Sequence, residues 1–429
     1  MAVENKPVEA TRTSEMPITW YSWIIIALCM LSYAVSFVDR NVWSTAIPVA
    51  APAMKLSMTA AGGLMTAFYI GYVVANFVSG WFVDRFGPRL TLGLSSLVTG
   101  LFTLLLPFGN SYATLFILRI IAGAGSGALF SAGVKFQLGW FPKSARATAM
   151  GIMMTGPTLG SAIASGALAP VIRTSGWQTA FTYAGIMTIV VALAVLLFAK
   201  ERGIAKASPK GAIGAGSGDA TKPVTTQSFL SLVLKRSFLL GCIACFLSIG
   251  ANQGFTTWII AYFTKVRGFS LVVAGGIFAA SSMVGLFGPT LAGFLCDLLK
   301  RRKAVCLVGA VGVALIIVAL ALTTNTSVLW GIMLVRGLIG PFLGIPLNTL
   351  QAESVAGPQA GSAMGFYNGI AQLGSVVFPI GLGLILDLTA NNYFIVLMAI
   401  AITYLLCGTL IAFMDEKRAT IVNTKTATA

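Results

Sequence analysis

Four charged residues lie within long apolar stretches of the sequence: Asp39, Arg40, Arg119 and Arg336. A charge at membrane depth is costly, so each of these residues is a candidate for function. Neighbours in a helix point about 100° apart, so Asp39 and Arg40 are not expected to face the same partner. One acid and three arginines leave about two positive charges uncompensated, and a planar guanidinium matches a carboxylate or phosphate group. The pattern predicts a site for a small anion. An internal ion pair that locks the helices is the alternative interpretation.

Two of these arginines begin helical faces that contain small residues. Gly123 follows Arg119 by four positions, and Gly340 follows Arg336 by four positions. Small residues beside an arginine are expected to leave space for a bound group. Polar side chains on other apolar stretches are predicted to complete the site, with an ordinary interhelical hydrogen bond as the alternative for each. These residues are Tyr72, Asn76, Gln253, Trp258, Asn368 and Gln372.

Groups suited to catalysis or metal binding are scarce. The sequence has no histidine, which excludes histidine-based acid–base catalysis and histidine metal ligands. All six cysteines fall inside apolar stretches, where they are expected to act as small packing residues. The acids are scattered, so we predict no enzyme, no cofactor and no metal site. A membrane receptor or an integral membrane enzyme is the alternative from another functional class.

The composition requires membrane-spanning elements to carry these residues. Hydrophobic residues make up 57% of the 429 residues, charged residues make up 9%, and the mean hydropathy is +0.89. Soluble chains carry about 25% charged residues, so a water-soluble fold is excluded. The apolar residues fall in stretches of about 20 residues, each long enough to cross a bilayer as a helix. The twelve predicted spans are 20–47, 60–82, 90–107, 112–139, 145–172, 177–199, 236–263, 271–298, 303–323, 327–353, 361–388 and 391–414.

The spans divide into two groups of six around a polar segment. The predicted order is an N-terminal tail (1–19), a first bundle (20–199), a basic Gly- and Ala-rich linker (200–235), a second bundle (236–414) and a C-terminal tail (415–429). With the N-terminus in the cytoplasm, most of the 28 Lys and Arg residues fall on the cytoplasmic side, as the positive-inside rule requires. The net charge of +16 therefore indicates topology and contact with anionic lipids, and no nucleic acid partner is expected.

The two bundles repeat one pattern. A shift of 213 residues brings Asp84 onto Asp297, and a shift of 217 brings Arg119 onto Arg336. The abundance of glycine and alanine in membrane helices explains some other matches, but not a matched acid and a matched arginine. Two parallel halves joined by a linker place a binding site between them near the middle of the membrane, and access alternates as one half rocks on the other.

The loop between the second and third predicted spans carries a charged motif. It reads Gly-Trp-Phe-Val-Asp-Arg-Phe-Gly-Pro-Arg, and its motif positions are Gly80, Asp84, Arg85 and Arg89. This motif resembles the G-x-x-x-D-R-x-G-x-R signature of the major facilitator superfamily, and the likeness extends over almost the full chain. The resemblance implies an all-α membrane fold with twelve helices in two pseudo-symmetric bundles. Asp84 and Arg85 are expected to act in gating by pairing across the cytoplasmic face in one state, and Asp297 stands in a degenerate second copy.

A closer resemblance is carried by the first, fourth and seventh predicted spans. The residues that carry it are Phe37 to Asn41, Arg119 to Gly123, Trp140 to Pro142, Thr257, Trp258 and Tyr262. They resemble the anion:cation symporter family, which includes bacterial sugar-acid transporters such as the D-galactonate transporter. The resemblance implies that Asp39 takes part in proton coupling and that Arg40 and Tyr72 contact the substrate. It also implies that Arg119 belongs to a buried charge network.

Two positions depart from that family. Ser126 stands where proton-coupled members carry a glutamate, and Pro157 replaces a polar residue that touches substrate in the family. A serine cannot carry the proton, so proton coupling would depend on Asp39 alone. The ligand is expected to be a less hydroxylated organic acid than a sugar acid.

We therefore predict a secondary transporter of a small organic anion, with proton symport as the favoured mode and alternating access as the mechanism. Its partners are expected to be the anion, protons and membrane lipids, and it is expected to work as a monomer in a bacterial-type inner membrane with both termini cytoplasmic. An anion exchanger is the main alternative, because exchange needs no proton site. A proton-coupled efflux pump is a further alternative, although a pump for cations should carry acids where this sequence carries arginines.

Overall fold

The computed structural model describes residues 18–202, 234–299, 301–355 and 360–414. Within these ranges the chain is helical and has no strand. The helices of the first half are α1 (Trp20–Ala53), α2 (Met58–Leu104), η1 (Leu106–Phe108), α3 (Tyr112–Ser126), α4 (Leu129–Trp140), η2 (Lys143–Ala145), α5 (Arg146–Ala162), η3 (Ile163–Ala167), α6 (Leu168–Ser175) and α7 (Trp177–Phe198). Those of the second half are α9 (Arg236–Lys265), α10 (Leu271–Val284), α11 (Gly288–Leu299), α12 (Arg302–Leu322), α13 (Thr326–Ile339), α14 (Pro341–Ser354), α15 (Ala360–Leu388) and α16 (Tyr393–Ala412).

Eleven apolar helical stretches in these ranges are long enough to span a membrane, and they make twelve crossings. The longest stretch, Met58–Phe108, has 51 residues. At about 1.5 Å per residue it is more than twice as long as the roughly 30 Å hydrocarbon core requires. Gly87 interrupts it with φ 80° and ψ 164°, a backbone conformation that only glycine adopts readily. α2 therefore crosses twice, once on each side of Gly87, and the predicted fold class is confirmed.

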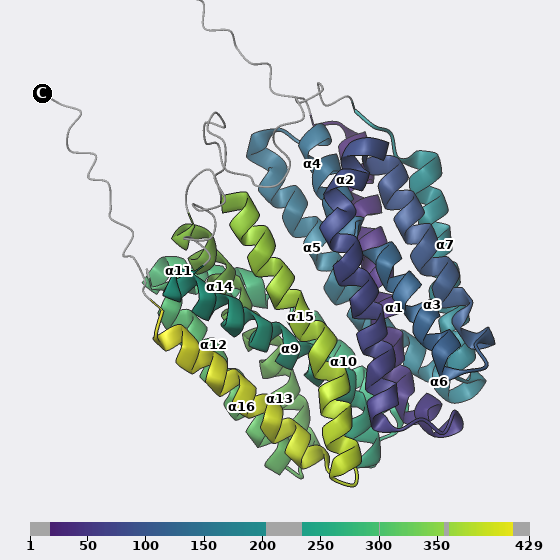
Figure 1. Ribbon diagram of the computed structural model, residues 1–429, viewed down its shortest axis with the longest axis vertical. Coiled ribbons are helices and arrows are strands. Elements are labelled where there is room, and N and C mark those ends of the chain that lie inside the picture. The colour runs from purple at the N-terminus through teal and green to yellow at the C-terminus, as the bar shows by residue number, and fades with distance from the viewer. Residues whose placement is uncertain (1–17, 203–233, 300, 356–359, 415–429) are drawn as a thin grey trace, which may run out of the picture.

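The two halves of the chain form helix bundles that lie side by side (Figure 1). The halves meet where α1 packs on α9, α2 on α15, and α5 on α10. At one end of the molecule, called the linker end below, α1 and α9 begin and α7 and α16 end. The predicted tails (1–19 and 415–429) and linker (200–235) lie almost entirely outside the described residues.

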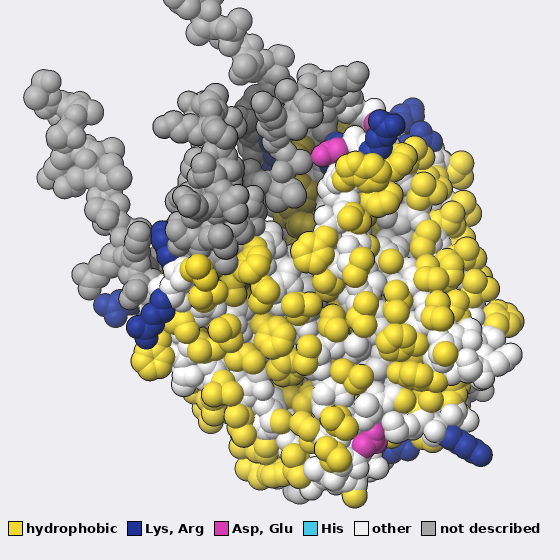
Figure 2. All heavy atoms as spheres, in the orientation of Figure 1, with side chains coloured by type: hydrophobic (Ala, Val, Ile, Leu, Met, Phe, Trp, Pro, Cys, Tyr) yellow, Lys and Arg dark blue, Asp and Glu magenta, His cyan; other side chains and the backbone are white. Residues whose placement is uncertain are grey.

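The outer face of the molecule is apolar. Large hydrophobic side chains are exposed on both halves, among them Leu197 on α7 and Leu315 on α12. Figure 2 shows hydrophobic side chains spread over the sides of the molecule, whereas Lys and Arg gather at its two ends. An apolar surface of this extent is unfavourable in water and is what a lipid environment requires. The chain is therefore a multi-pass membrane protein.

At the end opposite the linker, α2 and α15 join the two halves. The carboxylate of Asp387 accepts hydrogen bonds from the backbone N–H groups of Met58 and Thr59 (2.9 and 2.8 Å) and from the Thr59 hydroxyl (2.6 Å). A carboxylate at a helix N-terminus satisfies N–H groups that lack a partner in the helix, and it interacts favourably with the helix dipole. Gly62 allows the close approach, since a Cβ there would lie 2.3 Å from the carbonyl oxygen of Pro379. This end of the interface between the halves is closed.

Asp387→Asn is expected to loosen this closure. The amide keeps the shape of the side chain but loses the charge that strengthens its hydrogen bonds. At this exposed position the loss is about 1 kcal/mol, or roughly fivefold in the balance between closed and open forms. The measurement is the rate at which a cysteine at Ile380, which packs against Gly62, reacts with a membrane-impermeant maleimide, in a chain whose native cysteines are replaced. Asp387→Asn should raise that rate up to fivefold.

The matched control is Ser111→Ala. It removes a helix cap at the same end of the molecule but within the first half, and it should leave the labelling rate unchanged. Equal labelling rates in the two variants would contradict the role assigned to Asp387.

Close packing of α2 on α3 sets the position of Arg119. A Cβ at Gly71 would lie 1.8 Å from the carbonyl oxygen of Ile120, and one at Gly123 would lie 1.9 Å from that of Phe68. Backbone meets backbone at both points, an arrangement typical of membrane helices. The expectation that Gly123 leaves open space beside Arg119 is wrong, because α2 fills it.

Gly71→Ala is expected to destabilise the first bundle. A new methyl group facing a backbone oxygen must push α2 and α3 apart, and overpacking of this kind costs about 1–3 kcal/mol. We expect the apparent Tm of the detergent-purified protein to fall by about 5 °C. Gly331→Ala is the control, since a Cβ at that position meets nothing within 4 Å. A Tm that is the same in both variants would show that the contact has no effect on stability.

Candidate functional site

Arg40 lies near the middle of α1 and carries a buried charge with no acidic partner. Its side chain is 5% exposed, and its guanidinium lies over the rings of Phe37 (4.3 Å to the centroid), Tyr72 (4.5 Å) and Tyr69 (5.1 Å). Its Nε has no hydrogen-bond partner, and no acidic side chain among the described residues forms an ion pair with it. Aromatic faces stabilise a cation but do not neutralise it. The site is therefore suited to an anion.

Asp39 points away from Arg40, as the spacing predicted. Its side chain is fully buried, and its Oδ2 accepts a hydrogen bond of 2.8 Å from the hydroxyl of Thr188 on α7. Its Oδ1 has no partner. Within the described ranges it forms no ion pair, so the salt bridge considered as an alternative is absent there. A buried carboxyl with one free oxygen is well suited to gaining and losing a proton.

Arg119 connects three helices through backbone oxygens. It donates hydrogen bonds to the carbonyl groups of Leu64 (3.2 Å), Asp39 (3.0 Å) and Arg40 (3.4 Å), and its side chain is 1% exposed. Its guanidinium thereby fixes the backbone of α1 at the two positions from which the side chains of Asp39 and Arg40 extend. The Ser126 hydroxyl donates to the Gly123 carbonyl of its own helix (3.0 Å) and takes no part in this network.

Arg336, at the end of α13, has a similar environment in the second half. Its side chain is 9% exposed, and its guanidinium lies 3.9 Å from the centroid of the Phe255 ring. It donates to the side-chain oxygen of Asn252 on α9 (2.8 Å), and its Nε has no partner. A shift of 213 aligns Asn252 with Asp39.

The remaining predicted site residues lie on α2, α9 and α15. Tyr72 stacks on Arg40, and Asn76 is half-buried one turn further along α2. Gln253 is buried and its Nε2 has no partner. The indole of Trp258 donates to the Pro379 carbonyl (3.1 Å) and so holds α9 on α15. On α15, Asn368 is exposed and Gln372 is half-buried. Of these six residues, Tyr72 is the one whose contact with Arg40 is established.

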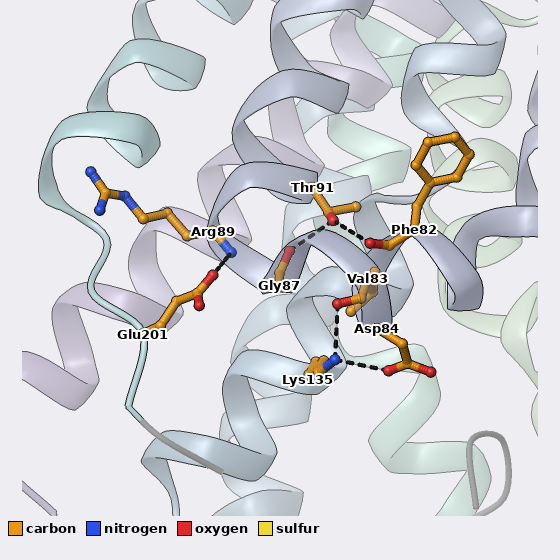
Figure 3. A network of polar contacts seen from close by, with 8 residues as sticks. All are labelled: Phe82, Val83, Asp84, Gly87, Arg89, Thr91, Lys135 and Glu201. Atoms are coloured by element: carbon orange, nitrogen blue, oxygen red, sulfur yellow. Dashed lines mark hydrogen bonds and ion pairs between the residues drawn. The ribbon is translucent and has the colours of Figure 1, made fainter. Parts of the chain in front are cut away.

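The motif near the linker end holds its charge pair within the first half. Figure 3 shows the Lys135 ammonium pointing at Asp84, with Nζ 2.8 Å from the Asp84 Oδ1 and 2.8 Å from the Val83 carbonyl. Arg85 and Asp297 are exposed, and Gly80 is half-buried. In this conformation Asp84 pairs within its own bundle, and the described residues show no pairing of Asp84 across the linker end.

A second contact ties the motif to the segment that follows α7. The backbone N–H of Arg89 donates to Glu201 (3.1 Å), while its guanidinium extends away from Glu201 (Figure 3) and donates to the Leu196 carbonyl (3.0 Å). Glu201 was predicted only as part of a linker. The carboxylate of Glu201 lies against the turn at Gly87. A side chain at position 87 would collide with this carboxylate, so the contact requires glycine there.

Comparison with known proteins agrees with this architecture. The family model described as the Major Facilitator Superfamily matches residues 29–379 and 287–425. The chain is 26% identical to the "Probable sulfoacetate transporter SauU" of Cupriavidus necator, over 86% of the chain and 88% of that protein. It is 26% identical to the hexuronate transporter of Escherichia coli K12, over 85% and 88%.

A solved structure supports the fold alone. A bacterial homologue of the human lysosomal transporter Spinster, in an inward-facing and occupied conformation, superimposes with a TM-score of 0.74 at 17% identity, over 92% of this chain and 96% of that one.

Proposed function

The chain belongs to the major facilitator superfamily, a superfamily of transporters and not of enzymes, and from this premise we propose that it carries a small organic anion across the membrane. The observation that supports the proposal most strongly is Arg40, a buried guanidinium surrounded by aromatic rings and without an acid. Two relatives are named as a probable sulfoacetate transporter and a hexuronate transporter, and both named substrates are organic anions, in agreement with that chemistry.

Arg40 and Tyr72 are proposed to bind the anion directly, and Arg119 to position Arg40. The anion would bind Arg40 through charge-assisted hydrogen bonds, which a planar guanidinium can make in pairs. The uncharged part of the anion is proposed to contact four polar side chains, Asn76, Gln253, Asn368 and Gln372. Trp258 is better assigned to holding α9 on α15, because its N–H is already used by the Pro379 carbonyl.

Alternating access is the proposed mechanism. The contacts of Asp387 and Gly62 close one end of the interface, so the anion would enter or leave at the linker end in this conformation. Opening the end that Asp387 and Gly62 close would require α15 to move away from α2. Asp84, Arg85, Arg89 and Asp297 are proposed to form the closure at the linker end. With the linker end in the cytoplasm, the protein would sit as a monomer in a bacterial inner membrane, with basic residues near anionic lipid headgroups.

Proton symport is the proposed mode, with Asp39 as the group that carries the proton. Its free Oδ1 and its burial support this role, and Ser126 cannot substitute because its hydroxyl does not ionise near neutral pH. An organic anion exchanger is the second candidate. The single acid in the buried network favours it, because exchange needs no proton.

The proposal is tested by screening purified protein against organic acids and then measuring transport. Mono- and dicarboxylates are first ranked by the rise they cause in apparent Tm, since a ligand that binds the folded state stabilises it. Acids that bind are then tested for uptake into proteoliposomes, with an inward proton gradient or with the same acid preloaded. Gradient-driven uptake supports symport, and uptake only into preloaded vesicles supports exchange. Binding and uptake of apolar compounds but of no acid would overturn the anion proposal in favour of efflux.

A further inference from the structure

We infer that the transported anion carries two negative groups and that the second group binds to Arg336 and Asn252 in the second half. This inference rests on the proposed function and deepens it, because it names the substrate class. Arg40 would bind one end of the molecule, and the pair on α13 and α9 would bind the other.

The internal repeat shows what the second half lacks. A shift of 217 aligns Arg336 with Arg119, and a shift of 213 aligns Asn252 with Asp39. In both halves the arginine bonds to the aligned residue of the first helix: Arg119 to the backbone oxygen of Asp39, and Arg336 to the side-chain oxygen of Asn252. The second half therefore repeats the arginine but has a neutral amide in place of the acid.

Among the described residues, no acidic side chain neutralises the buried charge of Arg336. Its polar neighbours are Asn252 and Tyr404, both uncharged, and its guanidinium lies on the face of Phe255. Its Nε has no partner, which is also true of Arg40. An unpaired buried charge is unfavourable, and it is stabilised when a ligand supplies the opposite charge. A side chain that reached out of the bundle toward the headgroups would not be 9% exposed.

The two arginines lie in opposite halves, and their aromatic neighbours belong to the same buried cluster. Tyr69 and Tyr72, whose rings hold Arg40, belong to one continuous cluster of buried residues with Phe255, whose ring holds Arg336. That cluster crosses the contact between α1 and α9. A monoanion would neutralise only one of the two guanidinium groups. A dianion that reaches both would also join the halves, which is how substrate can favour the closed intermediate of alternating access.

The experiment compares diacids with their monomethyl esters. Each pair has nearly the same shape and differs by one charge; the probes are succinate, glutarate and adipate with the corresponding half-esters. Initial uptake into proteoliposomes is measured for the wild type and for Arg336→Gln. We expect the wild type to favour at least one diacid over its half-ester by tenfold or more. Arg336→Gln should lose that preference, because it should lower diacid uptake at least tenfold more than half-ester uptake.

Asn252→Asp provides a second test that leaves Arg336 in place. The new carboxylate would pair with Arg336 and supply the negative charge that the second half lacks, so diacid uptake should fall at least tenfold more than half-ester uptake. Arg267→Gln is the matched control, because Arg267 bonds to Tyr262 and to the Leu320 carbonyl away from this pair; it should keep the wild-type preference.

Three outcomes would overturn the inference. The wild type could move diacids and half-esters equally well. Alternatively, Arg336→Gln and Asn252→Asp could both lower the uptake of the two probes by the same factor, which would assign Arg336 a structural role. If the wild type neither binds nor moves any acid of either charge, the proposed function itself fails and the inference with it.

Discussion

Arg40→Gln is expected to lower the initial rate of acid uptake at least 100-fold. The glutamine keeps a polar side chain but removes a buried charge that lies among aromatic rings without an acid. Removing one member of a buried, hydrogen-bonded charge pair costs about 2–5 kcal/mol, and roughly 3 kcal/mol corresponds to a factor of about 100. The measurement is uptake of the acid that stabilises the wild type most, at a concentration well below its KM.

Arg40→Lys and Arg267→Gln complete this experiment. Lysine restores the charge but not the planar fork or the broad stacking surface, so it should recover only part of the rate. Arg267→Gln removes a positive charge outside the proposed site and should stay within about threefold of wild type. An Arg40→Gln protein that is folded and transports at more than a third of the wild-type rate would exclude Arg40 as the anion-binding group.

Asp39→Asn is expected to separate net transport from exchange. Asparagine can still accept the hydrogen bond from Thr188, so the local packing survives, but the residue can no longer gain or lose a proton. Uptake driven by an inward proton gradient should therefore fall to the background of protein-free vesicles. Counterflow of the same acid, which needs no net proton movement, should stay within about threefold of wild type.

Ser126→Ala is the control for Asp39→Asn, because the Ser126 hydroxyl bonds only within its own helix. It should keep both activities. If Asp39→Asn retained gradient-driven uptake, the proton would have to travel by another route. If both activities were lost in a folded protein, Asp39 would be needed for the conformational change itself.

Much of this site was predictable because charges in a membrane are rare. Asp39, Arg40, Arg119 and Arg336 stand out in apolar stretches by residue type alone, and the helical angle between neighbours correctly separated Asp39 from Arg40. The motif around Asp84 and the repeat likewise indicated the fold, which the family match then confirmed.

The predictions failed where the partner of a residue is backbone. Arg119 bonds to carbonyl oxygens, which every residue has, so no pattern of side chains marks them. The role of Asp387 depends on the end of α15 meeting the start of α2, more than 300 positions earlier in the sequence. The tight approach at Gly123 likewise became visible only when α2 and α3 were placed together.

The central claim is that a small organic anion crosses the membrane through this protein by way of Arg40. It is tested most directly by measuring uptake of the acid that gives the largest rise in Tm, in parallel, into vesicles with wild-type protein, with Arg40→Gln protein and without protein. We predict saturable uptake by the wild type and uptake by Arg40→Gln close to the protein-free background. Equal uptake by wild type and Arg40→Gln, or binding of the acid by the wild type without any transport, would contradict the claim.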